Sequence, residues 1–243
     1  MHPYVSSVVE KITQSIETQE ETLQEVSYLL ANRVENEGIL HVLGSGHSHM
    51  IAEEIFYRAG GPLFVNPILE PGLMLHNGPI KSTRIERLPG YANAVLKDIE
   101  FNENDAFLII SNSGRNVLPI ETALFARDRN LLTLSITSLA HSKSVESRHS
   151  SGKRLFEITD YVLDNYGEVG DASIHMKNPS ISYGPTSSAV GIVLVQTLIS
   201  MVIESLVEKG IQPPLLQSAN LDHTDSKNEK VVQKYIDRIP LLR

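Results

Sequence analysis

The chain has 243 residues, which is enough for one domain with a well-buried core and too few for two large domains. Hydrophobic residues make up 41% of it and charged residues 21%, close to the averages of soluble globular proteins, so extensive disorder is excluded. The absence of cysteine excludes disulfides, thiolate nucleophiles and cysteine-based zinc sites. A net charge of -8 argues against nonspecific binding to nucleic acid, which needs clustered Lys and Arg.

Residues 1–14 are polar with isolated apolar positions and lack the continuous apolar region of a signal peptide. We therefore expect a cytoplasmic protein. The most apolar stretch, residues 189–203, is interrupted by Gln196, Thr197 and Ser200, and it is too short to cross a bilayer as one helix. It predicts a buried helix, so we expect no membrane partner.

Residues 4–37 contain neither Gly nor Pro, and their apolar residues recur at three- and four-residue spacing. This pattern predicts one or two long amphipathic helices that end at Gly38. We divide the chain accordingly into an N-terminal helical extension, residues 1–37, and a main domain, residues 38–243. The extension is long for its modest apolar face, which indicates that it also packs on a second subunit. A monomeric mass in solution would refute this.

From residue 39 the pattern changes to short apolar runs, each followed by small polar residues and a helical stretch. Strands are expected at residues 39–43, 63–68, 106–110 and 131–136, with a weaker fifth at 161–164. Helices are expected from the first of these turns to residue 59, and at residues 117–130 and 187–209. Such alternation predicts an α/β domain with a parallel sheet covered by helices on both faces.

Two stretches predict loops. Residues 72–90 combine Pro and Gly breaks with the basic residues Lys81, Arg84 and Arg87, which indicates a long loop near the strand ends or a plain surface connection. Residues 138–153 are rich in Ser, His and Lys and predict a mobile loop. Near the C-terminus, Ser226 and Glu229 match a capping box before a structural helix.

Three of the strand-to-helix turns are rich in hydroxyls and glycine. They are Gly44–Ser48, Ser111–Asn116 and Gly184–Ser188. A helix N-terminus presents unpaired N–H groups and about half a positive charge, so it suits a phosphate. In a parallel sheet these turns converge outside the carboxyl ends of the strands. The sequence therefore predicts a phosphate site at this edge of the sheet.

Other interpretations of the turns exist. The first begins like the dinucleotide-binding pattern Gly-x-Gly-x-x-Gly, but His49 stands where the third glycine belongs. Ser-rich helix starts are also ordinary N-caps, and for each turn alone that interpretation is the stronger one. Three such turns in one small sheet favour phosphate binding.

At these residues the chain resembles the sugar isomerase (SIS) domain family. The resemblance rests on Gly44-Ser45-Gly46-x-Ser48-x-x-x-Ala52, on Ser111-Asn112-Ser113-Gly114 and on Pro185-Thr186-Ser187, and it covers residues 38–210. It is closest to uncharacterised members described as phosphoheptose isomerases. It implies a three-layer α/β/α sandwich with a flavodoxin-like sheet, a homodimer or homotetramer, and sites lined by two subunits.

The resemblance also implies site residues. It assigns binding of the substrate phosphate to Ser45, Ser48, Ser111, Ser113, Thr186 and Ser187. The same turns offer further substrate contacts at Gly44, Gly46, Asn112, Gly114 and Arg115.

Isomerisation of an aldose to a ketose needs a base that moves a proton between adjacent carbons and a group that moves protons between oxygens, usually Glu and His. The family places this Glu further along the first helix, where this chain has Arg58, and a His on the last core helix, where this chain has none. Glu53 and Glu54 lie earlier, and neighbours on a helix point about 100° apart, so one of them can face the pocket. We assign the base to Glu54 or Glu53 and the proton shuttle to His47 or another loop histidine.

The leading hypothesis is a sugar-phosphate isomerase of the phosphoheptose isomerase type that works through an enediol. A non-catalytic sensor or regulatory protein is the alternative, and it would keep the phosphate turns without the Glu and His pair. A lyase or etherase acting on an amino-sugar phosphate also begins with proton abstraction by a carboxylate. No histidine spacing indicates a metal site, and we expect no metal and no organic cofactor.

Overall fold

The computed structural model describes residues 1–177 and 181–243 of the chain. At its centre is a five-stranded parallel sheet in the order β2-β1-β3-β4-β5. The strands are β1 (Leu40–Gly44), β2 (Val65–Pro67), β3 (Ala106–Ile110), β4 (Leu132–Thr137) and β5 (Tyr161–Asp164). This is the strand order of flavodoxin-like folds, so the predicted fold class is confirmed.

The three central strands are buried because helices cover both faces of the sheet. Every residue of β1, β3 and β4 is buried. The strand β3 is a continuous apolar run, as is usual for strands covered on both faces. The strand β4 instead alternates Leu and Ile with Thr133, Ser135 and Thr137, whose buried hydroxyls are hydrogen-bonded. The register pairs Val42 with Leu108 and Leu108 with Leu134, so these side chains form a row on one face of the sheet.

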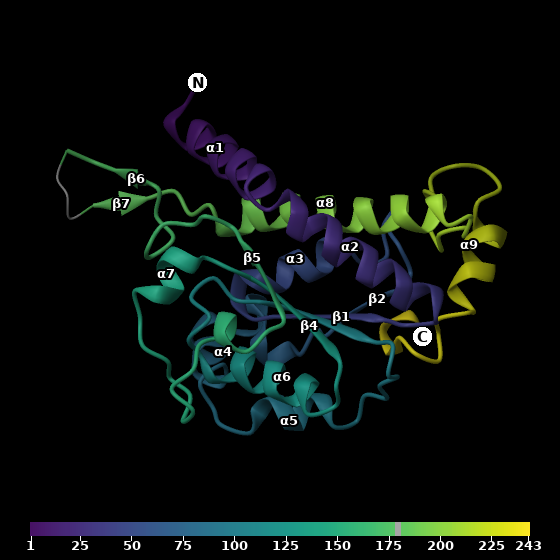
Figure 1. Cartoon of the computed structure of the whole chain (residues 1–243), viewed down its shortest axis with the longest axis horizontal. Helices are drawn as coiled ribbons and strands as arrows, with labels where there is room; N and C mark the ends of the chain where they lie inside the picture. The colour runs from purple at the N-terminus through teal and green to yellow at the C-terminus, as the bar shows by residue number, and fades with distance from the viewer. Residues whose placement is uncertain (178–180) are drawn as a thin grey trace.

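Helices form a layer on each side of the sheet (Figure 1). One layer contains α2 (Glu20–Glu35), α3 (His49–Glu54) and α8 (Ser187–Glu208), with α1 (Pro3–Glu17) packed on α8. The other contains α4 (Pro79–Ile85), α5 (Tyr91–Leu96) and α6 (Val117–Arg127). The apolar side chains divide into two buried clusters, one beneath each layer.

The helix α8 anchors the first layer. Its inner side packs on α2 and α3, and Leu194, Leu198 and Val202 are fully buried there. A fully buried Leu or Val contributes roughly 1.5–3 kcal/mol relative to an exposed one, so this contact stabilises the fold strongly. Among the described residues, α8 alone is long and apolar enough to cross a membrane by length and composition. The helix has 22 residues, more than the apolar stretch predicted from the sequence, so its length does not exclude a membrane-spanning helix. Its apolar character is explained by the side that is buried against the rest of the fold.

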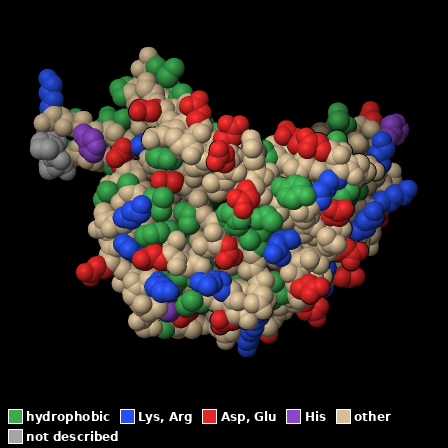
Figure 2. All heavy atoms as spheres, viewed as in Figure 1, with side chains coloured by type: hydrophobic (Ala, Val, Ile, Leu, Met, Phe, Trp, Pro, Cys, Tyr) green, Lys and Arg blue, Asp and Glu red, His purple; other side chains and the backbone are tan. Residues whose placement is uncertain are grey.

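The N-terminal extension forms two helices, because the chain turns between α1 and α2 at Thr18 and Gln19. The start of α1 projects from the body beside a hairpin of β6 (Ile174–His175) and β7 (Ser182–Tyr183), which the sequence did not predict (Figure 1). Tyr4 ties the two by donating to the carbonyl of Pro185 at 2.9 Å. Hydrophobic side chains are exposed at the projecting start of α1 and also over the body, where acidic and basic side chains are interspersed with them (Figure 2).

Four local expectations differ from the structure. Residues 72–90 contain α4 and two short helical turns, and residues 138–153 contain α7 (Leu139–Lys143). The first helix after β1 ends at Glu54, five residues before the predicted end at Ala59. The last helix, α9 (Asp225–Val232), begins after Thr224, so Ser226 does not cap it. Thr224 instead donates to the carbonyls of Ser218 and Leu221.

Candidate functional site

A cavity of about 280 Å³ lies at the carboxyl ends of β1 and β3. The helix α3 follows β1 on one face of the sheet, and α6 follows β3 on the other. Open parallel sheets bind ligands at such a switch point. The predicted site residues that line this cavity are Ser45, Gly46, His47, Ser48, Ser111, Asn112, Ser113 and Ser187.

The turn after β1 requires glycine. A Cβ on Gly44 would lie 2.6 Å from the carbonyl carbon and oxygen of Ser48, which is closer than atoms can approach. Gly46 has a φ of 57°, in the left-handed region that glycine adopts without strain. The compact turn brings Gly46, His47 and Ser48 to the cavity wall directly before α3. The Ser48 hydroxyl has no hydrogen-bond partner within the described part of the chain.

The turn after β3 has a related geometry. Gly114 has a φ of 56°, and its N–H donates to Oγ of Ser111 at 3.3 Å. The carbonyl of Asn112 accepts the N–H of Ser138 at 3.0 Å, which ties this turn to the end of β4. Ser113 lines the cavity, and its hydroxyl has no partner among the residues described. The two turns therefore present free hydroxyls to one space.

A carboxylate that the sequence analysis did not single out joins these turns. Glu86, next to the end of α4, accepts the Ser45 hydroxyl at Oε1 over 2.6 Å and the Asn116 amide at Oε2 over 2.7 Å. Asn116 in turn accepts a bond of 2.6 Å from Arg148. Glu86 lines the cavity, and this chain of bonds fixes its carboxylate there.

A second carboxylate holds the start of α8. Oδ1 of Asp171 accepts the N–H groups of Thr186 at 3.1 Å and Ser187 at 3.0 Å. Its Oδ2 accepts the Ser187 hydroxyl at 2.5 Å. Asp171 thus occupies the position at the α8 N-terminus that an anion favours. The predicted role of Thr186 and Ser187 in phosphate binding stays a prediction.

A histidine from α7 completes the cavity wall. His141 lines the cavity, and its Nδ1 is buried without a partner among the described residues. Burial lowers the pKa of His141, the charge of Asp171 opposes this, and the charge of Arg115 adds to it. The lowered pKa favours a neutral imidazole, which can both donate and accept a proton.

Glu53 and Glu54 do not line this cavity. In the short helix α3 the buried side is taken by Ile51, Ala52 and Ile55, which pack toward α8. Glu53 is half-exposed and lies 3.7 Å from Nε2 of His49. Glu54 pairs with Arg58 one turn later. Their assignment as the base stays a prediction, and so does the role of His47, which does line the cavity.

Other predicted contacts lie behind the wall. Gly44 and Gly114 shape the two turns without lining the cavity. Arg115 donates through Nε to the carbonyl of Glu146 at 2.8 Å, which directs it toward the loop after α7. Thr186 is fully buried, and its Oγ1 has no partner in the described residues.

The sequence contained a signal for some of the missed residues. Residues 72–90 are expected near the strand ends, and Glu86 lies within this segment. The rule that ligand groups follow parallel strands also applies to β4, which leads to His141 on α7. Asp171 follows β5 after an irregular loop, and no local pattern marks it.

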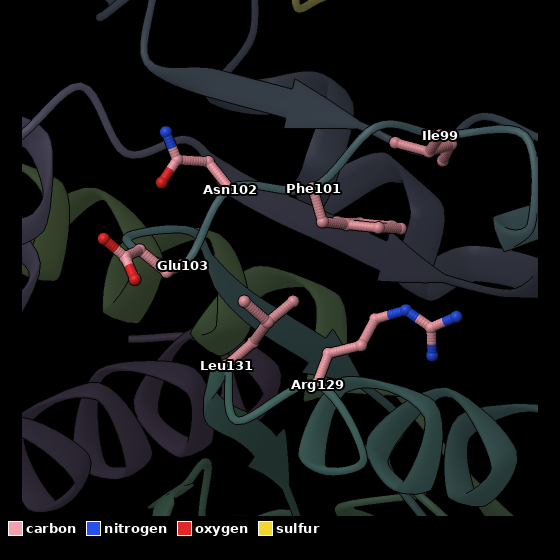
Figure 3. Close-up of a pocket in the computed structure, with 6 residues that line it drawn as sticks. All are labelled: Ile99, Phe101, Asn102, Glu103, Arg129 and Leu131. Atoms are coloured by element: carbon pink, nitrogen blue, oxygen red, sulfur yellow. The ribbon is translucent and has the colours of Figure 1, made fainter.

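A cavity of about 390 Å³ lies at the opposite edge of the sheet, where Asn102 and Glu103 precede β3 and Leu131 precedes β4 (Figure 3). Its charged side chains, Glu103 and Arg129, point to opposite sides. The Arg129 guanidinium lies 3.5 Å from the centre of the Phe125 ring. The polar side chains of this cavity do not converge on one point, unlike those of the cavity at the carboxyl ends of the strands.

Among the described residues, no group of three or more His, Asp or Glu side chains is arranged to hold a metal ion. The polar side chains that line the candidate site carry hydroxyls, amides, two carboxylates and two imidazoles.

Known proteins share sequence similarity with this chain. The family model described as SIS domain matches residues 3–138. A UPF0309 protein of Geobacillus sp. (strain WCH70) is 38% identical over 98% of this chain and 97% of its own length. A UPF0309 protein of Halalkalibacterium halodurans is 45% identical over 90% of this chain and 91% of its own. A solved phosphoheptose isomerase from Francisella tularensis has 15% identity and a TM-score of 0.48, over 83% of this chain and 95% of its own.

The family match covers more than half of the chain, and the curated relatives align with nearly all of it. The predicted resemblance is confirmed: the chain belongs to the UPF0309 family of SIS-domain proteins.

Proposed function

We propose that this chain binds a sugar phosphate in the cavity at β1 and β3 and converts it between aldose and ketose. The observation that carries the proposal is the convergence of two hydroxyl-rich turns, the Glu86 carboxylate and the His141 imidazole on a single cavity at the switch point of the sheet. The hydroxyls of Ser48, Ser111 and Ser113 supply donors for the phosphate without adding charge. The glycines of both turns let the backbone approach it.

Glu86 and His141 have the chemistry that isomerisation requires. In this proposal Glu86 takes the proton from C2 of the open-chain aldose, and the freed electron pair forms the C1–C2 double bond of an enediol. His141 protonates the O1 oxygen and then removes the proton from O2. Glu86 returns its proton to C1, which yields the ketose. Because Ser45 and Asn116 hold the carboxylate of Glu86, its orientation is fixed before the ligand arrives.

The first experiment is isothermal titration with aldose and ketose 5-, 6- and 7-phosphates, their unphosphorylated sugars and inorganic phosphate. Binding restricted to phosphorylated compounds supports the proposal. Ser113→Ala should weaken binding of the sugar phosphate about tenfold, since a hydrogen bond to a charged group contributes about 1.5–3 kcal/mol. Ser226→Ala, an exposed serine on α9, is the matched control and should leave affinity unchanged. No binding by any sugar phosphate at millimolar concentration would refute the proposal.

A binding-only sensor or regulatory protein is the second candidate. Two observations favour it: Arg58 stands at the position of the family's base, and both oxygens of Glu86 already accept hydrogen bonds. The sugars that bind are therefore incubated in D2O and followed by proton NMR. Exchange at C2 identifies an enzyme, and its absence identifies a sensor. Exchange followed by loss of the C3 substituent identifies the lyase or etherase.

We also propose that the protein acts in the cytoplasm as a homodimer or homotetramer. Support for the oligomer comes from exposed apolar side chains on the projecting α1 and the β6–β7 hairpin, including Val5, Val9 and Tyr183. A monomeric mass by light scattering would refute it.

A further inference from the structure

The charge of the candidate cavity is unusual for a site that receives a phosphate. Two carboxylates line it, those of Glu86 and Asp171, while no Lys or Arg belongs to the described residues of its wall. A bound phosphate places further negative charge in the same cavity of about 280 Å³. Like charges repel strongly in a partly dehydrated space, so the positions of the carboxylates restrict where a ligand's anionic groups can lie.

Asp171 hinders the binding of an anion at the end of the cavity next to the N-terminus of α8. Its carboxylate accepts two backbone N–H groups and the Ser187 hydroxyl within 3.1 Å, so the donors that would attract an anion there are already engaged. The residue adopts a φ of 59°, and the conformation is held by these contacts. A phosphate reaches this position only by displacing a carboxylate that belongs to the protein.

The turns after β1 and β3 are different. The hydroxyls of Ser48 and Ser113 have no partner in the described part of the chain, so they are free to donate to an anion. These turns and the α8 N-terminus line the same cavity, so a ligand can touch both at its two ends. An ionised carboxylate only accepts hydrogen bonds, and a group that meets Asp171 must therefore donate.

We infer that Asp171 determines both the orientation and the class of the ligand. The phosphate lies at the turns after β1 and β3, and the other end of the ligand donates hydroxyl hydrogens to Asp171. The site therefore accepts sugar phosphates with a neutral, hydroxylated far end and rejects those with a carboxylate there. The inference rests on the proposed function, because it concerns the same cavity and assumes a sugar phosphate.

His141 is consistent with this assignment. It lines the same cavity with an unpartnered Nδ1, and burial holds its pKa below the ordinary value. A neutral imidazole does not supply the positive charge that a second anionic group would need. No Lys or Arg among the described residues of the wall offsets the repulsion from Asp171 and Glu86.

The test compares matched ligands by isothermal titration. Glucose 6-phosphate is paired with 6-phosphogluconate, and ribose 5-phosphate with 5-phosphoribonate; each pair differs in a carboxylate at C1. The wild-type protein should bind the aldose of a pair at least tenfold more tightly than the acid. Asp171→Asn, which keeps the shape and removes the charge, should reduce this preference to threefold or less. Glu103→Gln, the same change in the cavity at the opposite edge, should leave it intact.

Inorganic phosphate is the third probe. Ser48→Ala and Ser113→Ala should each weaken its binding several-fold, whereas Ser187→Ala and Asp171→Asn should alter it less than twofold. Equal binding of aldose and acid by the wild type would overturn the inference even if no variant folds. A tenfold gain in phosphate affinity on Asp171→Asn would also overturn it, because α8 would then hold the phosphate. If no sugar phosphate binds at all, the proposed function fails instead.

Discussion

Ser45 and Glu86 lie 41 residues apart in the chain, and their side chains meet at 2.6 Å on the wall of the cavity. The contact joins the turn after β1 to the segment after α4, and Asn116 joins the same carboxylate to the start of α6. Glu86 is thus held by groups from both turns that receive the phosphate in the proposed reaction.

Glu86→Gln should nearly abolish turnover without weakening ligand binding. The amide keeps the shape of the side chain but cannot take up a proton, and general-base catalysis contributes about 10²–10⁴-fold to the rate. The measurement is C2 proton exchange in D2O alongside titration of the ligand. Glu53→Gln and Glu54→Gln are the matched controls, since both lie outside the cavity. If either of these loses exchange and Glu86→Gln does not, the base is the one that the sequence indicated.

Gly44→Ala and Gly46→Ala should differ in their cost to stability. In Gly46→Ala the new Cβ finds its nearest neighbour at 3.9 Å, so the cost is the left-handed backbone alone, about 1–2 kcal/mol. In Gly44→Ala the Cβ meets the backbone of Ser48 at 2.6 Å, so the turn itself must shift. Urea unfolding should show the larger loss for Gly44→Ala. A smaller loss for Gly44→Ala than for Gly46→Ala would show that the turn is not closely packed.

The sequence predicted the five strands of the sheet because each lies in a short stretch rich in apolar residues between polar turns, and β5 has the bounds that were expected. It missed α4 and α7, which are too short to show a helical period. It also missed the β6–β7 hairpin, whose strands have two residues each. Elements this short contain too few residues for a periodic pattern to stand out from that of a loop.

The candidate site was predicted only in part, for a related reason. The turns after β1 and β3 carry their own local signal of Gly and Ser, so Ser48 and Ser113 were found. Glu86 and Asp171 reach the cavity through tertiary folding, and nothing in their own segments distinguishes them from surface carboxylates. For Glu53 and Glu54, the helical spacing alone does not show whether either side chain points into the cavity. The packing of Ile51 and Ile55 toward α8 decided it.

The pKa of His141 should respond to its two charged neighbours in opposite directions. Burial lowers it, and the charge of Asp171 raises it, so Asp171→Asn should lower the pKa further. The charge of Arg115 lowers it, so Arg115→Gln should raise it toward the ordinary value of 6.5. Proton NMR titration of the His141 ring measures both shifts. If isomerisation needs a neutral His141, the acid limb of kcat/KM will move with the same sign in each variant. If the pKa of His141 measured by NMR shifts and the acid limb of kcat/KM does not, His141 takes no part in the reaction.

The buried pair of His41 and Asp105, near the amino ends of β1 and β3, should make the free energy of unfolding fall as the pH is lowered. His41 and Asp105 are both fully buried, and Nε2 of His41 lies 3.1 Å from Oδ2 of Asp105. Nη2 of Arg238 donates to Oδ1 of the same carboxylate at 2.9 Å and to Oδ2 at 2.7 Å. Burial lowers the pKa of His41 despite the opposing hydrogen bond to Asp105. Burial raises the pKa of Asp105, but its hydrogen bonds with His41, Asn102 and Ile39 outweigh this and leave it lowered.

The direction of the pH effect follows from these two shifts. Below pH 6.5 the unfolded chain protonates His41 while the folded chain does not, so the free energy of unfolding should fall by up to about 1.4 kcal/mol per pH unit. The Asp105 contribution is present above its ordinary pKa of 3.8 and is lost as the pH falls through the lower, folded value. Urea midpoints between pH 8 and 4 measure the first effect. Arg238→Gln should cost about 3 kcal/mol at pH 7, because it leaves a buried carboxylate without its cation. Arg243→Gln, which removes a charge that binds only backbone carbonyls, is the control. A flat pH profile, or equal losses in the two variants, would show that this buried group does not stabilise the fold.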